Sequence, residues 1–160
     1  MILISFNFNL ILLDVRGLKN LRNKTLLVLN ENKNITQMET IFLHENRLKN
    51  ERIEDLLKKF KKTLKSIEIS KMDVLGKLSS KFLFDLKKEN FKMINLLKLD
   101  ISFNYTAVND ELIEILVSVT PNLQDLNIKN CSKLTNNCFN SMMNSNWKET
   151  LLKLNIKYCD

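Results

Sequence analysis

The chain has 160 residues, of which 44% are hydrophobic and 27% charged, a composition typical of one folded globular domain and not of a disordered chain. Two glycines and one proline exclude collagen-like, linker-like and proline-rich sequences, and a single histidine, His44, excludes metal sites that need several imidazoles. Twenty-five Lys and Arg against 18 Asp and Glu leave a net charge of +7, which favours anionic partners.

Residues 1–37 are rich in apolar residues, and we expect them to form a degenerate N-terminal cap. The segment lacks the basic start and the cleavage site of a signal peptide. Leu27-x-Leu29-x-x-Asn32 matches the strand pattern described next, but 14 residues separate Leu13 from Leu27 and again Leu27 from Ile41. Because so short a spacing leaves no room for a full helix, we expect short strands here with a loop on the outer face.

Residues 38–160 contain about five copies of one pattern, which we interpret as a single continuous repeat domain. Each copy has an apolar-x-apolar centre, which predicts a short strand that buries alternate side chains. The residue that ends a copy is usually Asn or Cys, and we expect it to turn inward and to hydrogen-bond backbone groups. The starts lie 26, 32, 27 and 28 residues apart, in the copies Met38-x-x-Ile41-x-Leu43-x-x-Asn46, Leu64-x-x-Ile67-x-Ile69-x-x-Met72, Leu96-x-x-Leu99-x-Ile101-x-x-Asn104, Leu123-x-x-Leu126-x-Ile128-x-x-Cys131 and Leu151-x-x-Leu154-x-Ile156-x-x-Cys159.

Helices are predicted between the strands. Apolar residues recur at helical spacing over 51–64, and further helices are expected over 74–88 and 137–143. Asn109 is a candidate N-cap for a helix that carries Leu112, Ile113 and Leu116, and Pro121 favours an extended entry to the next strand. Strand, turn, helix and return make a right-handed βα unit.

The run from Thr120-Pro121-Asn122-Leu123 through Cys131-Ser132-Lys133-Leu134-Thr135-Asn136 resembles the leucine-rich repeat family, in the cysteine-containing subtype of F-box/leucine-rich-repeat proteins. The departures are Thr120 in place of a Cys before Pro, and Asn136 in place of Asp. The resemblance implies an α/β solenoid that is curved, with parallel strands on the concave face and helices on the convex face. It is specific over 96–160 and weaker toward the N-terminus.

The cysteines favour a reducing, intracellular location, cytoplasmic or nuclear. Cys131, Cys138 and Cys159 are odd in number and are not arranged as a disulfide framework. The chain has no Cys-x-x-Cys pair that would suggest a metal site, so we expect neither a metal nor a cofactor. His44 with Cys138 or a serine would form a nucleophile–base pair, but they belong to different repeats without an orienting carboxylate at recognisable spacing. We therefore expect no enzymatic activity.

Side chains that point away from the core fall into three columns across the repeats, and these columns are the candidate protein-binding site. Phe42 is either an exposed interface anchor or a residue covered by the N-terminal segment. The candidate binding residues are Phe42, His44, Glu68, Lys98, Asp100, Asp125, Asn127, Lys129, Lys153, Asn155 and Lys157.

These features predict a non-catalytic module that presents a rigid concave surface to a protein partner. The resemblance implies substrate recognition for a cullin-type ubiquitin ligase, although the chain shows no Leu-Pro-containing F-box helix. The alternative is a basic solenoid that binds nucleic acid or another polyanion through Lys98, Lys129, Lys153 and Lys157, with Asp100 and Asp125 weakening the field. No helix follows the last strand, so we expect either a fragment or a larger chain or complex that covers the C-terminal end.

Overall fold

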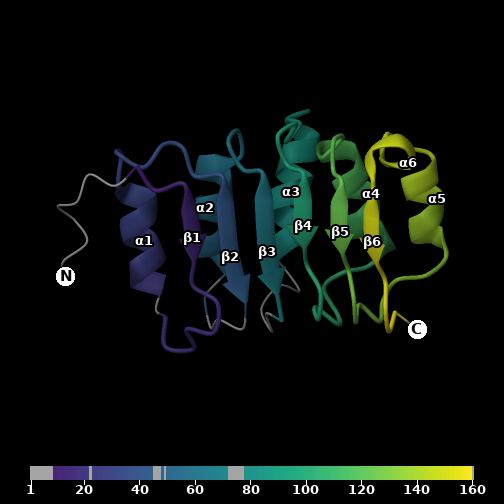
Figure 1. Cartoon of the computed structure of the whole chain (residues 1–160), viewed down its shortest axis with the longest axis horizontal. Helices are drawn as coiled ribbons and strands as arrows, with labels where there is room; N and C mark the ends of the chain where they lie inside the picture. Colours follow the sequence, from purple (N-terminus) through teal and green to yellow (C-terminus); the bar gives the residue numbers. More distant parts are fainter. Residues whose placement is uncertain (1–8, 22, 45–47, 49, 72–77, 160) are drawn as a thin grey trace.

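A computed structural model describes residues 9–21, 23–44, 48, 50–71 and 78–159 of the chain. The strands in these residues form one parallel sheet in sequence order, and Figure 1 shows them side by side with the helices packed behind the sheet. The strands are β1 (Leu12–Asp14), β2 (Thr40–His44), β3 (Ser66–Ser70), β4 (Lys98–Asp100), β5 (Asp125–Asn127) and β6 (Lys153–Asn155). The helices are α1 (Asn23–Glu31), α2 (Asn50–Phe60), α3 (Leu78–Lys88), α4 (Asp110–Val119), α5 (Asn137–Met143) and α6 (Trp147–Thr150).

The predicted fold class is confirmed: the chain is an α/β leucine-rich repeat solenoid with an open sheet. In all five copies the first apolar residue of the predicted strand centre lies in a strand, and these residues pair in register across β2 to β6. The second apolar residue lies in a strand only in β2 and β3, since Ile101, Ile128 and Ile156 directly follow β4, β5 and β6. Asn109 caps α4 as expected, because its side-chain oxygen accepts the N–H of Leu112 at 3.0 Å. The helix predicted over 137–143 is α5. The helix predicted over 51–64 ends at Phe60, and the part of 74–88 before Leu78 lies outside the described residues.

The expectation for the N-terminal segment was wrong in one respect: Leu27 and Leu29 lie in helix α1 and not in a strand. Leu13 in β1 pairs directly with Ile41 in β2, so these strands are 28 residues apart, an ordinary repeat spacing that accommodates a helix. The short apolar run 26–29 cannot distinguish a strand from a helix by periodicity. The helix is favoured in the folded chain because α1 buries Leu26 and packs beside α2.

Lys59 of α2 secures the end of α1, a role that the sequence did not reveal. Its ammonium donates to the carbonyl oxygens of Leu29, Asn30 and Asn32 at 2.9, 3.1 and 2.7 Å. These carbonyls belong to the last turn of α1 and the residue after it, where no intrahelical partners remain. Burial lowers the pKa of Lys59 from its usual value. A lysine from one repeat thus completes the helix of the repeat before it.

The core runs as a continuous stack of inward-facing strand residues covered by the helices. Leu126 of β5 has no exposed surface, whereas the equivalent Leu154 of β6 is 38% exposed because no further described strand covers it. Trp147 of α6 is buried, and its indole N–H donates to the carbonyl of Thr120 at 2.7 Å. Among the described residues, no helix is both long and apolar enough to cross a membrane.

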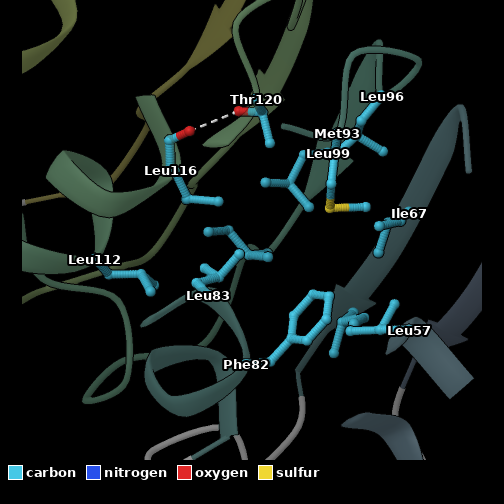
Figure 2. A pocket seen from close by; sticks show the side chains of 12 residues that line it. Leu57, Ile67, Phe82, Leu83, Met93, Leu96, Leu99, Leu112, Leu116 and Thr120 are labelled. Carbon is cyan, nitrogen blue, oxygen red and sulfur yellow. Dashed lines mark hydrogen bonds between the residues drawn. The ribbon is translucent and has the colours of Figure 1, made fainter. Parts of the chain in front are cut away.

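A cavity of about 50 Å³ lies inside the solenoid beneath β3 and β4 (Figure 2). Its walls are aliphatic and aromatic side chains, among them Phe82 of α3 and Leu99 of β4. The hydroxyl of Thr120 is turned to the carbonyl of Leu116, to which it donates at 2.8 Å. Because the apolar walls offer water no hydrogen-bond partners and the volume is too small for a typical ligand, we interpret the cavity as a packing defect.

Candidate functional site

The predicted columns are present on the concave face, which we define as the face of the sheet not covered by helices. The first column pairs Thr40, Ser66, Lys98, Asp125 and Lys153, and the second pairs Asp14, Phe42, Glu68, Asp100, Asn127 and Asn155. In the third column His44 pairs with Ser70. Backbone bonds extend this column beyond the short strands, since Lys71 N–H, Phe103 N–H and Asn130 N–H donate to the carbonyls of Ser102, Lys129 and Lys157. All eleven candidate residues therefore occupy the face expected for them.

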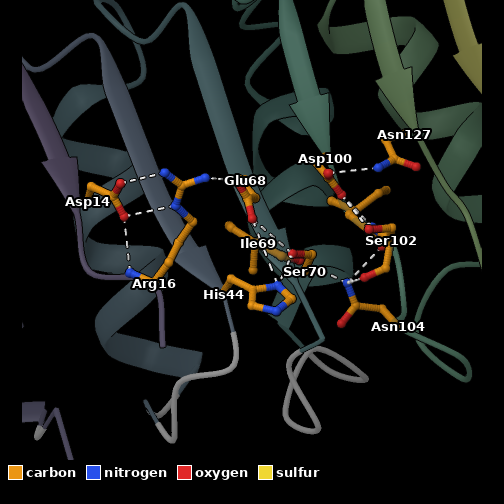
Figure 3. A network of polar contacts seen from close by, with 11 residues as sticks. Asp14, Arg16, His44, Glu68, Ile69, Ser70, Asp100, Ser102, Asn104 and Asn127 are labelled. Carbon is orange, nitrogen blue, oxygen red and sulfur yellow. Dashed lines mark hydrogen bonds and ion pairs between the residues drawn. The ribbon is translucent and has the colours of Figure 1, made fainter. Parts of the chain in front are cut away.

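An ionic network covers the N-terminal half of the concave face (Figure 3). The Arg16 guanidinium lies 2.6 Å from the Asp14 carboxylate and 3.4 Å from that of Glu68, so it joins β1 to β3 across β2. Hydrogen bonds from Arg16 hold the pKa of Asp14 below its usual value. Neither Asp14 nor Arg16 was a candidate in the sequence, because we expected a degenerate cap in this segment. Among these three side chains one guanidinium serves two carboxylates, so no excess of positive charge remains.

Phe42 lies within this network and not on an open surface. Its ring is half-buried, and the Arg16 guanidinium lies 4.6 Å from the ring centroid. An arginine over an aromatic face is a favourable cation–π arrangement. Of the two interpretations of Phe42, coverage by the N-terminal segment therefore describes its surroundings better.

His44, Ser70 and Glu68 converge in Figure 3, but their geometry differs from that of a catalytic triad. The His44 Nδ1 atom lies 2.6 Å from the Ser70 hydroxyl and 3.8 Å from a Glu68 carboxylate oxygen. A triad requires the serine and the carboxylate on different ring nitrogens, so that one nitrogen takes a proton while the other is held. Here both partners face the same nitrogen. Cys138, the other nucleophile considered, is buried in α5 behind the sheet.

Asp or Asn residues end four of the strands, and this role was not anticipated. Their side-chain oxygens accept the backbone N–H two residues further on, in the pairs Asp14–Arg16, Asp100–Ser102, Asn127–Lys129 and Asn155–Lys157, at 2.9 to 3.3 Å. Such a turn draws the backbone out of the strand. The four strands that end this way have three residues, whereas β2 and β3, with Phe42 and Glu68 at this position, have five. The recurrence of Asp or Asn at one repeat position was the sequence signal for these turns.

The residues that end the repeats form the predicted ladder of inward-turned side chains. Asn104 is buried, and its amide donates to the carbonyls of Ile69, Ile101 and Ser102 at 2.9, 2.7 and 3.3 Å. Cys131 and Cys159 make the equivalent S–H contact with the preceding repeat, at 3.6 Å to Ile101 and 3.0 Å to Ile128. The prediction for these positions is confirmed, while Asn46 and Met72 lie outside the described residues.

The cysteines occupy structural environments. Cys131, Cys138 and Cys159 are unpaired, and burial raises the pKa of the Cys131 thiol to about 12 and also raises that of Cys138. A thiol with a raised pKa is a poor nucleophile at neutral pH. Within the described residues, no group of three or more His, Cys, Asp or Glu side chains could hold a metal ion.

The C-terminal half of the concave face differs from the N-terminal half in charge. Within the described residues, the side chains of Lys98, Asp125, Lys153 and Lys157 have no hydrogen bond or ion pair. Lys129 instead lies between two aromatic rings, 5.1 Å from the centroid of Phe103 and 5.3 Å from that of Tyr158. Neither aromatic residue was a candidate, because the predicted columns ended one position before it in each repeat. The C-terminal half of the concave face therefore presents lysines that are available to a partner, together with asparagines and two aspartates.

Comparisons with known proteins identify a fold and not a family. No family model matches the chain, and no curated protein matches it. A solved structure with a similar fold is the crystal structure of the Rad7 and Elc1 complex in yeast, with a TM-score of 0.55 and 16% sequence identity. The match covers 92% of this chain but 50% of the other, so this chain spans about half the length of that protein. At this identity the likeness supports the solenoid fold alone.

Proposed function

We propose that the chain is a non-catalytic module that recognises a partner protein through its concave face. The observation that carries the proposal is the strand register, which aligns side chains that the core does not need in columns about 4.8 Å apart. The strand-ending turns fix the backbone beneath these columns. A partner that binds here would lose little entropy by ordering the surface, which favours recognition.

The arrangement of His44 supports a role without catalysis. Ser70 and Glu68 share one ring nitrogen of His44, and the thiols of Cys131 and Cys138 are buried with raised pKa values. The three unpaired cysteines also favour a reducing intracellular compartment, cytoplasmic or nuclear.

A more specific proposal is that the chain belongs to the cysteine-containing repeat subtype and selects substrates for a cullin-type ubiquitin ligase. The inward contacts of Cys131 and Cys159 agree with the subtype, and the similar structure is that of a protein in complex with Elc1. The purified chain should then bind a purified cullin-ligase adaptor in a pull-down assay. Failure to bind any such adaptor would contradict an autonomous ligase role and leave the broader proposal standing.

The broader proposal is tested by reversing charges on one face at a time. Lys98→Glu with Lys153→Glu changes the concave face, whereas Lys24→Glu with Lys88→Glu makes the same net change on exposed positions of α1 and α3. Proteins captured by the tagged wild-type chain are compared with those captured by the two variants. We expect the variant with Lys98→Glu and Lys153→Glu to stop capturing the partner, and the variant with Lys24→Glu and Lys88→Glu to capture it as the wild type does. A partner lost equally from both variants, or from the helix-side variant alone, would contradict recognition through the concave face.

A further inference from the structure

Lys129, Phe103 and Tyr158 form a cluster at the ends of β4, β5 and β6, which we call the aromatic–lysine cluster. Phe103 and Tyr158 occupy equivalent positions in their repeats, and both have left-handed backbone conformations, with φ of 59° and 60°. Gly17 and Asn130, residue types that adopt this conformation at lower cost, fill the same position in other repeats. The Tyr158 side chain is 68% exposed, and the Phe103 and Lys129 side chains are half-buried.

The cluster fixes a cation on the surface. The two rings face the Lys129 ammonium from neighbouring repeats at 5.1 and 5.3 Å, and the aromatic faces favour a positive charge between them. The Lys129 ammonium is therefore more restricted in position than that of a fully solvated lysine. An acidic group that approaches Lys129 would meet an ordered ammonium, with Tyr158 offering apolar area beside it.

The surroundings of the cluster supply further positive charge. Lys157 lies in the same column as Lys129, and Lys98 and Lys153 flank Asp125 in the first column. Asp100 is already engaged by the Ser102 hydroxyl at 2.6 Å and the Asn127 amide at 2.7 Å. Because Arg16 is already paired with Asp14 and Glu68, the unpaired positive charge on the concave face of the described residues lies over β4 to β6.

The arrangement favours an acidic polypeptide over a nucleic acid. Asp100 and Asp125 stand among the lysines, and they would repel a backbone that carries a phosphate at every residue. The ring faces of Phe103 and Tyr158 that meet Lys129 are not free for stacking with bases. The columns of β4 to β6 contain no arginine, the residue best suited to phosphate. Carboxylates on a peptide can be spaced to meet the lysines and avoid the aspartates.

We infer that the C-terminal half of the concave face binds an acidic polypeptide segment, with Lys129 as its central contact and Tyr158 as an aromatic anchor. The inference rests on the proposed function and specifies the chemistry of the partner and the part of the face that binds it. Lys98, Lys153 and Lys157 would contact further carboxylates of the same segment.

The test uses a fluorescent peptide of about ten residues in which glutamate alternates with serine, and an oligothymidylate of similar length, each titrated with the full chain in about 50 mM salt. Fluorescence anisotropy measures the affinity. We expect the peptide to bind more tightly than the oligonucleotide, and Lys129→Met to weaken peptide binding about fivefold or more. Lys88→Met, which removes an equal charge from α3, should change it less than about twofold. Amide NMR shifts on titration should concentrate at Phe103, Lys129 and Tyr158.

Three results would overturn the inference: no measurable peptide binding, tighter binding of the oligonucleotide, or equal losses from Lys129→Met and Lys88→Met. Circular dichroism of each variant establishes that it is folded. Binding of the partner captured in the previous experiment distinguishes a failure of this inference from a failure of the proposed function. If Lys98→Glu with Lys153→Glu abolishes its binding while Lys129→Met and Tyr158→Ala leave it unchanged, the concave face is the binding surface and the inferred segment is wrong. If the concave variants have no effect, the proposed function itself fails.

Discussion

Asn104 provides the most direct energetic test of the inward-turned ladder. Its side chain is 3% exposed, and its amide donates to three backbone carbonyls from two repeats. Asn104→Ala removes these donors and leaves the carbonyls in a site that water does not readily reach. At about 1 kcal/mol net for each of the two shorter bonds, with an added cost for buried unpaired oxygens, we expect a loss of about 2–4 kcal/mol in the free energy of unfolding.

Two further substitutions at Asn104 separate the donor role from simple packing. Asn104→Cys recreates the side chain that Cys131 presents to Ile101, so it should cost about 1–2 kcal/mol, less than alanine. Asn104→Asp is nearly the same size as asparagine but turns a carboxylate toward carbonyl oxygens, and it should cost more than alanine.

The assay is urea unfolding followed by circular dichroism and by fluorescence of Trp147, the single tryptophan of the chain, which is buried in α6. The order of stability should be wild type, then Cys, Ala and Asp. If Asp is as stable as Cys, or if Ala costs less than about 0.5 kcal/mol, the side chain does not act as a buried donor and the reasoning fails.

The remaining predictions concern Lys59, Cys131 and the strand-ending turns. Lys59→Met should lower stability by about 1–3 kcal/mol and speed hydrogen exchange in α1, because it leaves the carbonyls of Leu29 and Asn30 without a donor. Lys62→Met, an exposed control two residues after the end of α2, should cost less than about 0.5 kcal/mol, and equal effects would contradict the capping role. The pKa of Cys131 is about 12 in the fold against an ordinary 9.0, so the stability that the protonated thiol contributes is complete below pH 9 and is lost as the pH rises toward 12. Urea midpoints should therefore fall more steeply over this range in the wild type than in Cys131→Asn. Parallel curves would refute the assignment. Asn155→Ala should destabilise the chain by about 0.5–1.5 kcal/mol through loss of the turn at Lys157, whereas Asn155→Asp, which keeps the acceptor, should cost less. Urea midpoints measure both losses, and identical losses would show that the turn contributes nothing.

The repeats of residues 38–160 were predictable from sequence because their apolar spacing recurs with little change. Leu99, Leu126 and Leu154 each stand at the centre of a strand, and the side chains beside them fall into the expected columns. The inward role of Asn104 and the cysteines was predictable for the same reason, since one repeat position carries a small polar or sulfur-containing residue whose partner is the backbone.

The misassigned element, α1, illustrates the limit of pattern matching on a short run. Leu27 and Leu29 alternate as in a strand, and only the pairing of Leu13 with Ile41 shows that the intervening residues must form the helix that covers this repeat. Contacts between repeats were equally inaccessible, because they join residues far apart in sequence. The bonds from Lys59 to α1 and from Arg16 to Glu68 depend on how the repeats stack.

The candidate site was predicted in position but not in character. The columns were expected to consist of freely presented side chains, whereas Asp100 and Asn127 are engaged in turns and Phe42 lies under Arg16. Phe103 and Tyr158 were overlooked because nothing in a single repeat shows that a residue beyond the strand will face a lysine of the neighbouring repeat.

The central claim is that the concave face contacts the partner, and site-specific cross-linking tests it most directly. A photo-reactive phenylalanine analogue is placed at Asp125, whose side chain has no hydrogen bond or ion pair within the described residues, and in a separate variant at Lys88 on α3. We predict that the partner captured by the wild-type chain becomes covalently attached through position 125 and not through position 88. Attachment through position 88 alone would contradict it.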